Sequence, residues 1–220
     1  LHHNHTNKDL YICRFYGSSN IFIQDSYFRH TDGSVINIDQ VQILTSKLIV
    51  INAIFVNNTS GTAGGSLHVL NIATVSIRDC RFISNNANRG GSISIINAIF
   101  LSIRNSILSR NSANTAGGAI YISTINNTVF DHLDIMYNTG STYGGGIYTS
   151  QCRLVIVLKC NFLNNNVTIG GGGIAFHDCH KILLNKSMFL NNTAYSSGAA
   201  LHIFHSIDIF LKSSIFHGHK

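Results

Sequence analysis

The densest group of titratable side chains in this sequence is a set of histidines and an aspartate in its last quarter. His177, Asp178 and His180 stand together, and His202 and His205 follow. Histidine and aspartate bind transition metals and exchange protons near neutral pH, so this set is the first place to look for a metal or catalytic site. Because twelve histidines are spread over the chain, we interpret Asp178 and His205 as a structural pair. A metal site built from Asp178, His180 and His205 remains the alternative.

Carboxylates are scarce, with nine Asp and no Glu. Polysaccharide hydrolases and lyases need two carboxyl groups beside the same glycosidic bond. Asp25 and Asp79 would lie two repeats apart, and Asp131 and Asp134 would face opposite sides of a strand or straddle a turn. The sequence therefore predicts no paired-carboxylate site, no catalytic residue and no cofactor.

Cysteine usage leaves two interpretations open. The five cysteines form an odd set without a CxxC motif, which excludes a disulfide-dense scaffold. Cys152 and Cys179 are 27 residues apart, and the repeat described below makes them neighbours on adjacent strands, close enough for a disulfide. Parallel side chains on neighbouring strands fit disulfide geometry poorly, so two buried thiols are the favoured interpretation.

Asn-x-Ser/Thr sequons occur somewhat more often than composition alone would give, which favours secretion by a glycosylating cell. The candidate glycosylation sites are Asn4, Asn57, Asn58, Asn126, Asn166, Asn185 and Asn191.

A repeat must position all of these residues. A glycine pair returns at intervals of 26, 27, 27, 27 and 27 residues, the last copy being Gly-Ala. The pairs begin at Gly64, Gly90, Gly117, Gly144, Gly171 and Gly198. A fixed period of this length indicates one structural unit stacked on copies of itself. We expect these glycines to adopt positive φ or to pass close to the neighbouring unit.

A second signature lies in register with the glycines. Each unit carries a large apolar residue followed three positions later by Asn, as in Phe162 and Asn165. Such Asn side chains can bond to one another and to the turn backbone above and below, so we predict a structural ladder. Its members are Asn58, Asn85, Asn111, Asn138, Asn165 and Asn192.

Period-two runs precede each Phe and follow each glycine pair, which indicates two strands per unit and a short third around the Phe. Without any sustained helical periodicity, this predicts an all-β, right-handed parallel β-helix of about eight coils, each about 27 residues long. We expect one domain over 1–220, irregular over 1–25 and regular over 26–216. Thr128, at an aliphatic position, predicts a local bulge. Polar caps are not evident, so we expect a fragment of a longer protein.

The chain carries a net charge of +6 and is 45% hydrophobic. Its basic residues partly stack, which we interpret as a solvated face, with attraction to acidic glycans or a membrane surface as the alternative. The sequence lacks a basic cluster interleaved with aromatic residues, so we do not expect it to bind nucleic acid. No apolar run approaches the length of about 18 residues that a transmembrane helix needs.

Phe162-Leu-Asn-Asn165 and Phe189-Leu-Asn-Asn192, together with Gly117-Gly118-Ala119-Ile120, resemble the FxxN and GGA[ILV] repeats of chlamydial polymorphic membrane proteins and related extracellular β-helix proteins. The resemblance covers roughly residues 26 to 216. It departs from FxxN at Leu108 and Ile135. It implies a surface-exposed rod, which in some members is an adhesin, and it implies little about activity.

The sequence as a whole predicts a non-enzymatic extracellular structural or adhesive segment of a surface or fibre-forming protein. Its expected partners are other protein chains, further coils of the same protein, or surface glycans. The alternative is a carbohydrate-active β-helix enzyme, of the lyase or hydrolase type, or a glycan-binding module. An enzyme should carry long loops inserted into several coils, and the nearly constant repeat interval leaves little room for them.

Overall fold

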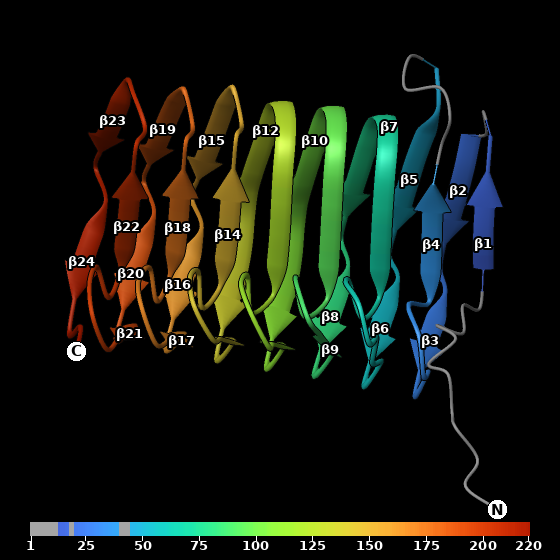
Figure 1. The fold of residues 1–220 in the computed structure, drawn as a ribbon, viewed down its shortest axis with the longest axis horizontal. Helices are drawn as coiled ribbons and strands as arrows, with labels where there is room; N and C mark the ends of the chain where they lie inside the picture. Colours follow the sequence, from blue (N-terminus) through green and yellow to red (C-terminus); the bar gives the residue numbers. More distant parts are fainter. Residues whose placement is uncertain (1–12, 18–19, 40–44) are drawn as a thin grey trace, which may run out of the picture.

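The structure, a computed structural model, describes residues 13–17, 20–39 and 45–220 as a stack of parallel strands without a helix (Figure 1). Each coil contributes a strand to three lateral faces, which we call A, B and C, and most coils add a two-residue strand at a fourth position. Within the described ranges there is no helix that could span a membrane.

Face A begins each coil directly after the glycine pair. Its strands are β1 (Cys13–Tyr16), β4 (Ile36–Asp39), the first parts of β7 (Leu67–Arg78), β10 (Ile93–Ser109) and β12 (Ile120–Met136), then β14 (Ile147–Ser150), β18 (Ile174–His177) and β22 (Leu201–Phe204).

Face B follows across a bend. Its strands are β2 (Asn20–Gln24), β5 (Lys47–Ile51), the middle parts of β7, β10 and β12, then β15 (Leu154–Leu158), β19 (Lys181–Asn185) and β23 (Ile209–Lys212).

Face C carries the Phe column. Its strands are β3 (Tyr27–Arg29), β6 (Ile54–Val56), β8 (Arg81–Ile83), the last parts of β10 and β12, then β16 (Asn161–Leu163), β20 (Met188–Leu190) and β24 (Ile215–His217). The fourth position holds β9 (Asn86–Ala87), β11 (Ser112–Ala113), β13 (Thr139–Gly140), β17 (Asn166–Val167) and β21 (Thr193–Ala194).

The strands pair in parallel and in the register that the repeat predicts. Ile120 pairs with Ile147, which pairs with Ile174, so equivalent residues of successive coils stack directly. Seven such pairings link the eight strands of face A. In Figure 1 the chain rises along the near face and descends along the far face as it moves towards the C-terminus, which is a right-handed turn. The predicted right-handed parallel β-helix is confirmed.

Residues in the left-handed region make the corners between faces. Asn97 lies between faces A and B with φ +61°, and Asn105 lies between faces B and C with φ +47°. Asn, Asp and His tolerate this conformation better than other non-glycine residues, and they are frequent at these corners. This allows β7, β10 and β12 to turn the corners while remaining continuous strands.

The two glycines of each pair serve different purposes, both among those expected. Gly144 adopts φ +66°. Gly145 passes so close to the next coil that a Cβ would stand 2.5 Å from the carbonyl oxygens of Asn166 and Gly172. The first position therefore needs a residue that turns left-handed, and the second needs one without a side chain.

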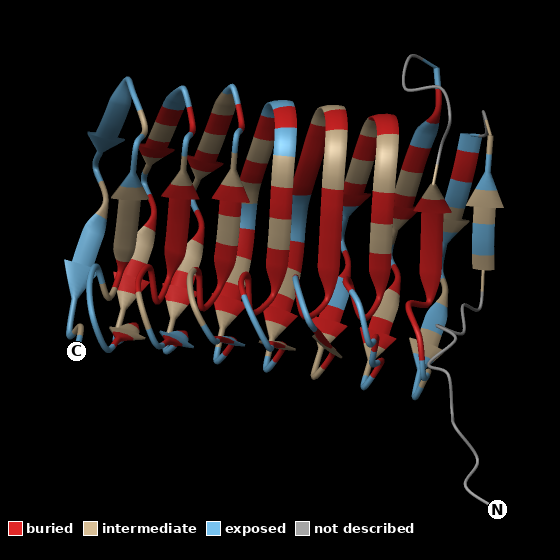
Figure 2. Ribbon diagram, viewed as in Figure 1, coloured by how far each residue is buried: buried red, intermediate tan, exposed pale blue. Residues whose placement is uncertain are grey.

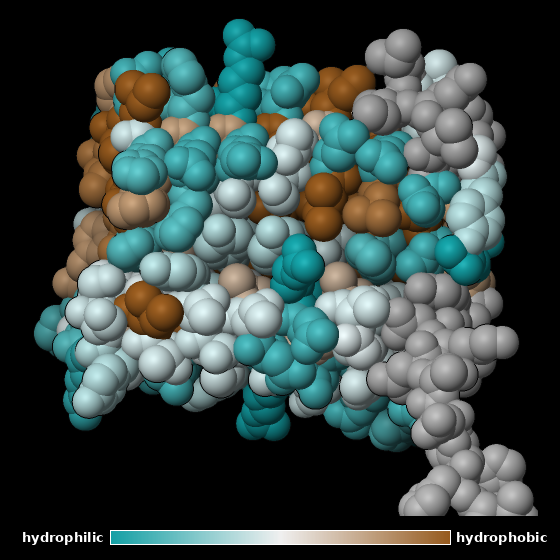
Figure 3. All heavy atoms as spheres, in the orientation of Figure 1, coloured by the Kyte–Doolittle hydropathy of each residue, from teal (hydrophilic) through white to brown (hydrophobic). Residues whose placement is uncertain are grey.

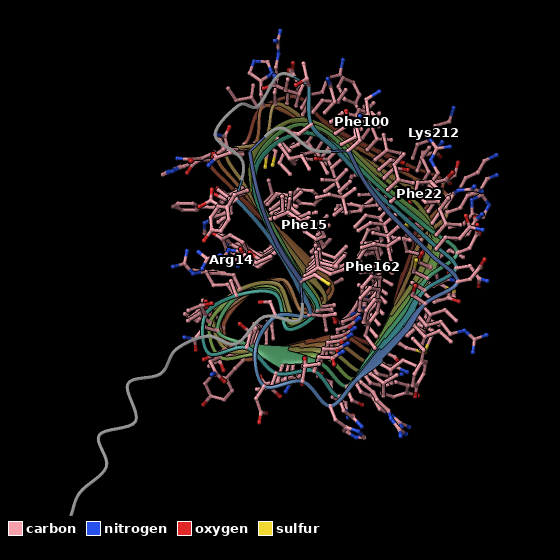
Figure 4. The ribbon with its side chains drawn as sticks, turned by 90° about the vertical axis from the view of Figure 1, so that its right-hand side faces the viewer. Arg14, Phe15, Phe22, Phe100, Phe162 and Lys212 are labelled. Atoms are coloured by element: carbon pink, nitrogen blue, oxygen red, sulfur yellow. The ribbon has the colours of Figure 1, made fainter. Side chains whose placement is uncertain are left out.

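The core lies inside the coil, where alternate residues of most strands are buried, whereas β23 and β24 at the C-terminal end are exposed (Figure 2). Seen along the axis, Phe15 and Phe162 point inward, whereas Arg14, Phe22 and Lys212 point outward (Figure 4). On face C the Phe rings stack across successive coils, with centroids 4.9 Å apart between Phe55 and Phe82. Side chains therefore fill the rod, and chemistry with an external molecule belongs to its outer faces.

Two expectations about regularity need correction. β1 and β2 pair in register with β4 and β5, so regular stacking begins before residue 26. β12 keeps its register with β15 through Thr128, so no bulge forms there. Thr128 is fully buried in a position otherwise taken by aliphatic residues, because threonine has nearly the shape of valine and fits the same space.

Candidate functional site

The six repeated asparagines form a continuous hydrogen-bonded column inside the turn after face C. The Asn138 Nδ2 donates to Asn165 Oδ1 at 2.9 Å and to the Leu108 carbonyl oxygen at 2.9 Å. Its backbone N–H donates to the same Asn165 Oδ1 at 3.0 Å. Each side chain thus bonds to the coils on both sides, and the pattern recurs from Asn58 to Asn192. All six are buried, so this column acts on the fold and does not meet a ligand.

The ladder also removes one glycosylation candidate. The Asn58 side chain is fully buried, and its Nδ2 donates to Asn85 Oδ1 at 2.9 Å. An oligosaccharide on that nitrogen would break the ladder, so Asn58 is not a glycosylation site in the folded chain. Asn57, Asn126, Asn166 and Asn191 are exposed and Asn185 is half-buried, whereas Asn4 lies outside the described residues.

The structure brings together only part of the histidine and aspartate set. Asp178 Oδ1 lies 3.5 Å from His205 Nδ1, and both side chains are more than half exposed. His180 is exposed at the end of the same corner, just before β19. Within the described part of the chain no three His, Cys, Asp or Glu side chains converge as metal ligands. The pair is a solvent-exposed contact, of the kind that contributes little to stability.

Cys152 and Cys179 occupy the corner between faces A and B in adjacent coils, and both are free, buried thiols. The disulfide interpretation is therefore not the one that the structure adopts, because the two side chains leave parallel strands in the same direction. The hydrogen bond with the Cys179 sulfur, together with burial, raises the pKa of Cys152. Burial likewise raises the pKa of Cys160, to about 12. The Cys152 and Cys160 thiols, held in the protonated form, are poor nucleophiles. The hydrogen bond with Cys152 acts in the opposite direction on its partner and lowers the pKa of Cys179 to about 7.

Four of the described aspartates contact a histidine or an asparagine. Asp131 Oδ1 lies 2.7 Å from His132 Nδ1, and Asp134 Oδ1 accepts a hydrogen bond from Asn161 Nδ2 at 2.8 Å. Asp25 accepts from Asn52 at 2.6 Å and Asp79 from Asn105 at 3.3 Å. Each of these four aspartates is thus engaged by the equivalent position of a neighbouring coil or by an adjacent residue.

A patch of aromatic rings and histidines covers the outer side of face A towards the C-terminal coils. The Tyr143 ring lies 4.6 Å from His177 and 5.3 Å from His202, centroid to centroid, and the rings of Tyr121 and Tyr148 stack at 5.2 Å. Phe204 extends the patch, 5.2 Å from His177. We call these six residues the face A patch: Tyr121, Tyr143, Tyr148, His177, His202 and Phe204. They are half-buried, except Phe204, which is exposed.

The alternation of side-chain size along face A creates this patch. Ala175 stands between Tyr148 and His202 in the outward column. Tyr143, which comes from the turn before the glycine pair, contacts the rings of both Tyr148 and His202. Such ring clusters present large, rigid and partly polar surfaces, which are typical of recognition sites.

The patch is uncharged at neutral pH. Burial lowers the pKa of His177, and the neighbouring His202 lowers it further, while Asp178 acts in the opposite direction. Burial also lowers the pKa of His202. Both imidazoles are thus neutral at pH 7 and can donate or accept hydrogen bonds at the edge of an apolar surface.

Two members of this patch, His177 and His202, belong to the histidine and aspartate set that the sequence displays. The column containing Tyr121, Tyr148 and His202 follows from the repeat, because these residues are separated by 27 and 54 positions. His177 and Phe204 belong to the next outward column, and Tyr143 precedes its glycine pair. A survey of both outward columns and of the residue before each glycine pair would have found all six.

The fold and this lateral patch define the chain as a repeat-built β-helix whose exposed chemistry lies on its sides. Residues 105–123 match the family model described as the Chlamydia polymorphic membrane protein repeat. The match contains Asn111 and the Gly117–Ile120 motif, so the resemblance seen in the sequence is confirmed. No curated protein and no solved structure matches the chain. The repeat and the fold fit the β-helix of a surface protein.

Proposed function

We propose that this chain is a non-enzymatic, extracellular structural or adhesive segment of a surface or fibre-forming protein, and that it binds partners through its outer faces. The face A patch carries this proposal, because it places rings on the outside of a rod whose core is already complete without them. Residues that add nothing to the core and cluster on one face are typical of interaction surfaces.

Three further observations support this proposal. The repeat match lies in the middle of the rod, at residues 105–123. The Asn ladder gives a rigid support, which lowers the entropic cost of presenting a binding surface. Asp131 and Asp134 lie in the same coil but contact different partners, His132 and Asn161, and Asp25 contacts Asn52. These separate contacts do not favour the glycosidase or lyase alternative.

An adhesion assay tests the proposal. Beads displaying the full chain are applied under flow to a panel of cultured cells and immobilised polysaccharides. We expect retention above that of albumin-coated beads, and a marked loss of retention with the double variant Tyr143→Ala/Phe204→Ala.

Tyr195→Ala is the matched control, because that ring is 90% exposed and lies outside the patch. Retention equal to albumin on every surface would argue against adhesion. Release of soluble sugars from any of the polysaccharides would favour the enzyme alternative.

A further inference from the structure

A groove lies on the outer side of face A, over β7 and β10, next to the face A patch. Its volume is about 470 Å³, in the range of small-molecule sites. In Figure 3, which looks onto face A, hydrophobic surface is visible over β7 and β10 between hydrophilic side chains. Its lining residues are Thr62, Ala63, His68, Leu70, Asn88, Arg89, Ile96 and Thr115.

Beside the groove, the outward column of face A becomes small at one coil. Ser94 stands between His68 and Tyr121 in that column. Its side chain is buried, and its hydroxyl has no hydrogen-bond partner among the described residues. Leu70 and Ile96 occupy the next outward column in the same two coils, so they form an apolar base.

The opposite wall consists of turn residues that hydrogen bonds hold in place. Asn88 Nδ2 donates to the Gly61 carbonyl oxygen at 2.7 Å, and Asn88 Oδ1 accepts from Asn114 Nδ2 at 3.0 Å. Thr115 Oγ1 donates to the Asn88 carbonyl oxygen at 2.6 Å. A wall that is already ordered needs little reorganisation to bind a ligand.

The charge in the groove comes from Arg89. Its guanidinium lies 5.7 Å from the centre of the Tyr121 ring, and the residue is exposed. None of the lining residues is acidic, and no described carboxylate is within ion-pair distance of Arg89. Arginine recognises planar anions through paired N–H groups. The groove thus combines an apolar base, polar side chains and one cation without an acidic partner.

We propose that this groove binds a pyranose ring that carries a carboxylate or sulfate group, as a unit of an acidic glycan. Arg89 binds the anionic group, the apolar side of the sugar ring lies on Leu70 and Ile96, and Thr62 and Asn88 meet ring hydroxyls. Because it names the partner class of the adhesive surface, this inference rests on the proposed function. Nucleic acid fits less well, since such binding draws on several phosphate contacts and the lining holds a single permanent cation.

Saturation-transfer NMR on the full chain tests the inference with three small sugars that differ at one carbon. These are methyl β-glucuronide, methyl β-glucoside 6-sulfate and the neutral methyl β-glucoside. We expect one or both acidic sugars to bind at least about tenfold more tightly than the neutral one, since a charge-assisted hydrogen bond is worth at least that much. The two acidic sugars tell which anionic group the groove prefers.

Arg89→Gln is the decisive variant, and Arg153→Gln, an exposed arginine on another face, is its control. We expect the acidic sugars to lose at least about tenfold in affinity with Arg89→Gln and to be unaffected by Arg153→Gln. Equal binding of all three sugars, or full binding by Arg89→Gln, would overturn the inference.

The bead assay separates this inference from the proposed function. If beads adhere and Arg89→Gln adheres equally well, the acidic-sugar inference is wrong and adhesion stands. If no beads adhere anywhere, the proposed adhesion is wrong, and the NMR result decides the groove independently.

Discussion

Each ladder asparagine satisfies both its own amide and the turn backbone of the adjacent coils. The Asn138 Oδ1 accepts from the Asn111 backbone N–H at 2.9 Å and from its Nδ2 at 3.0 Å, while the Asn138 Nδ2 serves the opposite side. Buried polar groups without such partners are costly. A leucine at this position would therefore orphan donors and acceptors in two neighbouring coils.

We expect Asn138→Leu to lower the free energy of unfolding by about 1–3 kcal/mol, the cost of leaving buried polar groups unpaired. The measurement is the urea midpoint of the circular dichroism signal. Asn127→Leu is the control, because Asn127 is exposed on the same coil. An unchanged midpoint for Asn138→Leu would contradict a stabilising ladder.

Thr128 presents the opposite situation, a buried hydroxyl with no hydrogen-bond partner in the described structure. We expect Thr128→Val to raise the free energy of unfolding by about 1 kcal/mol, because valine keeps the shape and removes the unsatisfied group.

Thr149→Val supplies the comparison for Thr128→Val. Thr149 is also fully buried, but its Oγ1 donates to the Ala175 carbonyl oxygen at 3.3 Å. This substitution should destabilise the chain, as judged by the same urea midpoint. Equal shifts for the two valine variants would show that hydrogen bonding at these positions does not decide stability.

The residues that the sequence predicts well are those that the repeat displays several times. The ladder asparagines and both glycines of each pair have one physical task in every coil, so their columns are uniform. Arg89 and Tyr143 are different, because each acts once, from a turn, on rings of the neighbouring strand columns. The patch and the groove depend on such single residues. The period of the sequence gives the column that each occupies, but not the rings that its side chain contacts.

At the scale of the strands, the inward and outward residues of face A follow different patterns. Its inward residues are mostly aliphatic, with Thr149 and Phe176 among the exceptions, while its outward columns vary from Ser94 to Tyr121. Leu70 and Ile96 line the groove in one outward column, and Tyr121 and Tyr148 stack in the neighbouring outward column as part of the patch. One sheet face can thus carry different surfaces on a constant core.

The neutral imidazoles of face A make its stability depend on pH. The pKa of His177 and of His202 lies below the ordinary value of about 6.5 that each has in the unfolded chain. Between the lowered pKa and about 6.5, the unfolded chain binds more protons than the folded one. Stability from this pair is therefore complete above about pH 6.5 and falls as pH drops through that window.

We expect the urea midpoint of the native chain to fall more between about pH 7.5 and about pH 5 than that of His177→Gln/His202→Gln. The comparison uses the change in midpoint between the two pH values for each protein. The variant loses the Ser197–His202 hydrogen bond at both pH values, so that loss cancels in the change. Parallel pH profiles would show that the two histidines are not held neutral. The effect should be modest, since solvent screens half-exposed groups.

At the scale of the whole molecule, each coil contacts only the coils beside it. The strands β10 and β12 each pair with strands of the coil before and of the coil after, and their inward residues are buried. β23 and β24 each pair with one described strand and are exposed along their whole length. In a structure of this kind, stability is a sum of coil and interface contributions, so it differs along the rod.

Amide hydrogen exchange should therefore follow a gradient, which mass spectrometry of peptic fragments can measure. We expect the slowest exchange in fragments from 93–136 and the fastest in fragments from 201–217, because strands in 201–217 pair with described strands on one side and those in 93–136 pair on both sides. In Asn138→Leu, protection should decrease first in the coils that contain Asn111 and Asn165, its ladder neighbours. Uniform protection along the chain would instead mean that the rod opens as a single cooperative unit, with the ladder coupling every coil to every other.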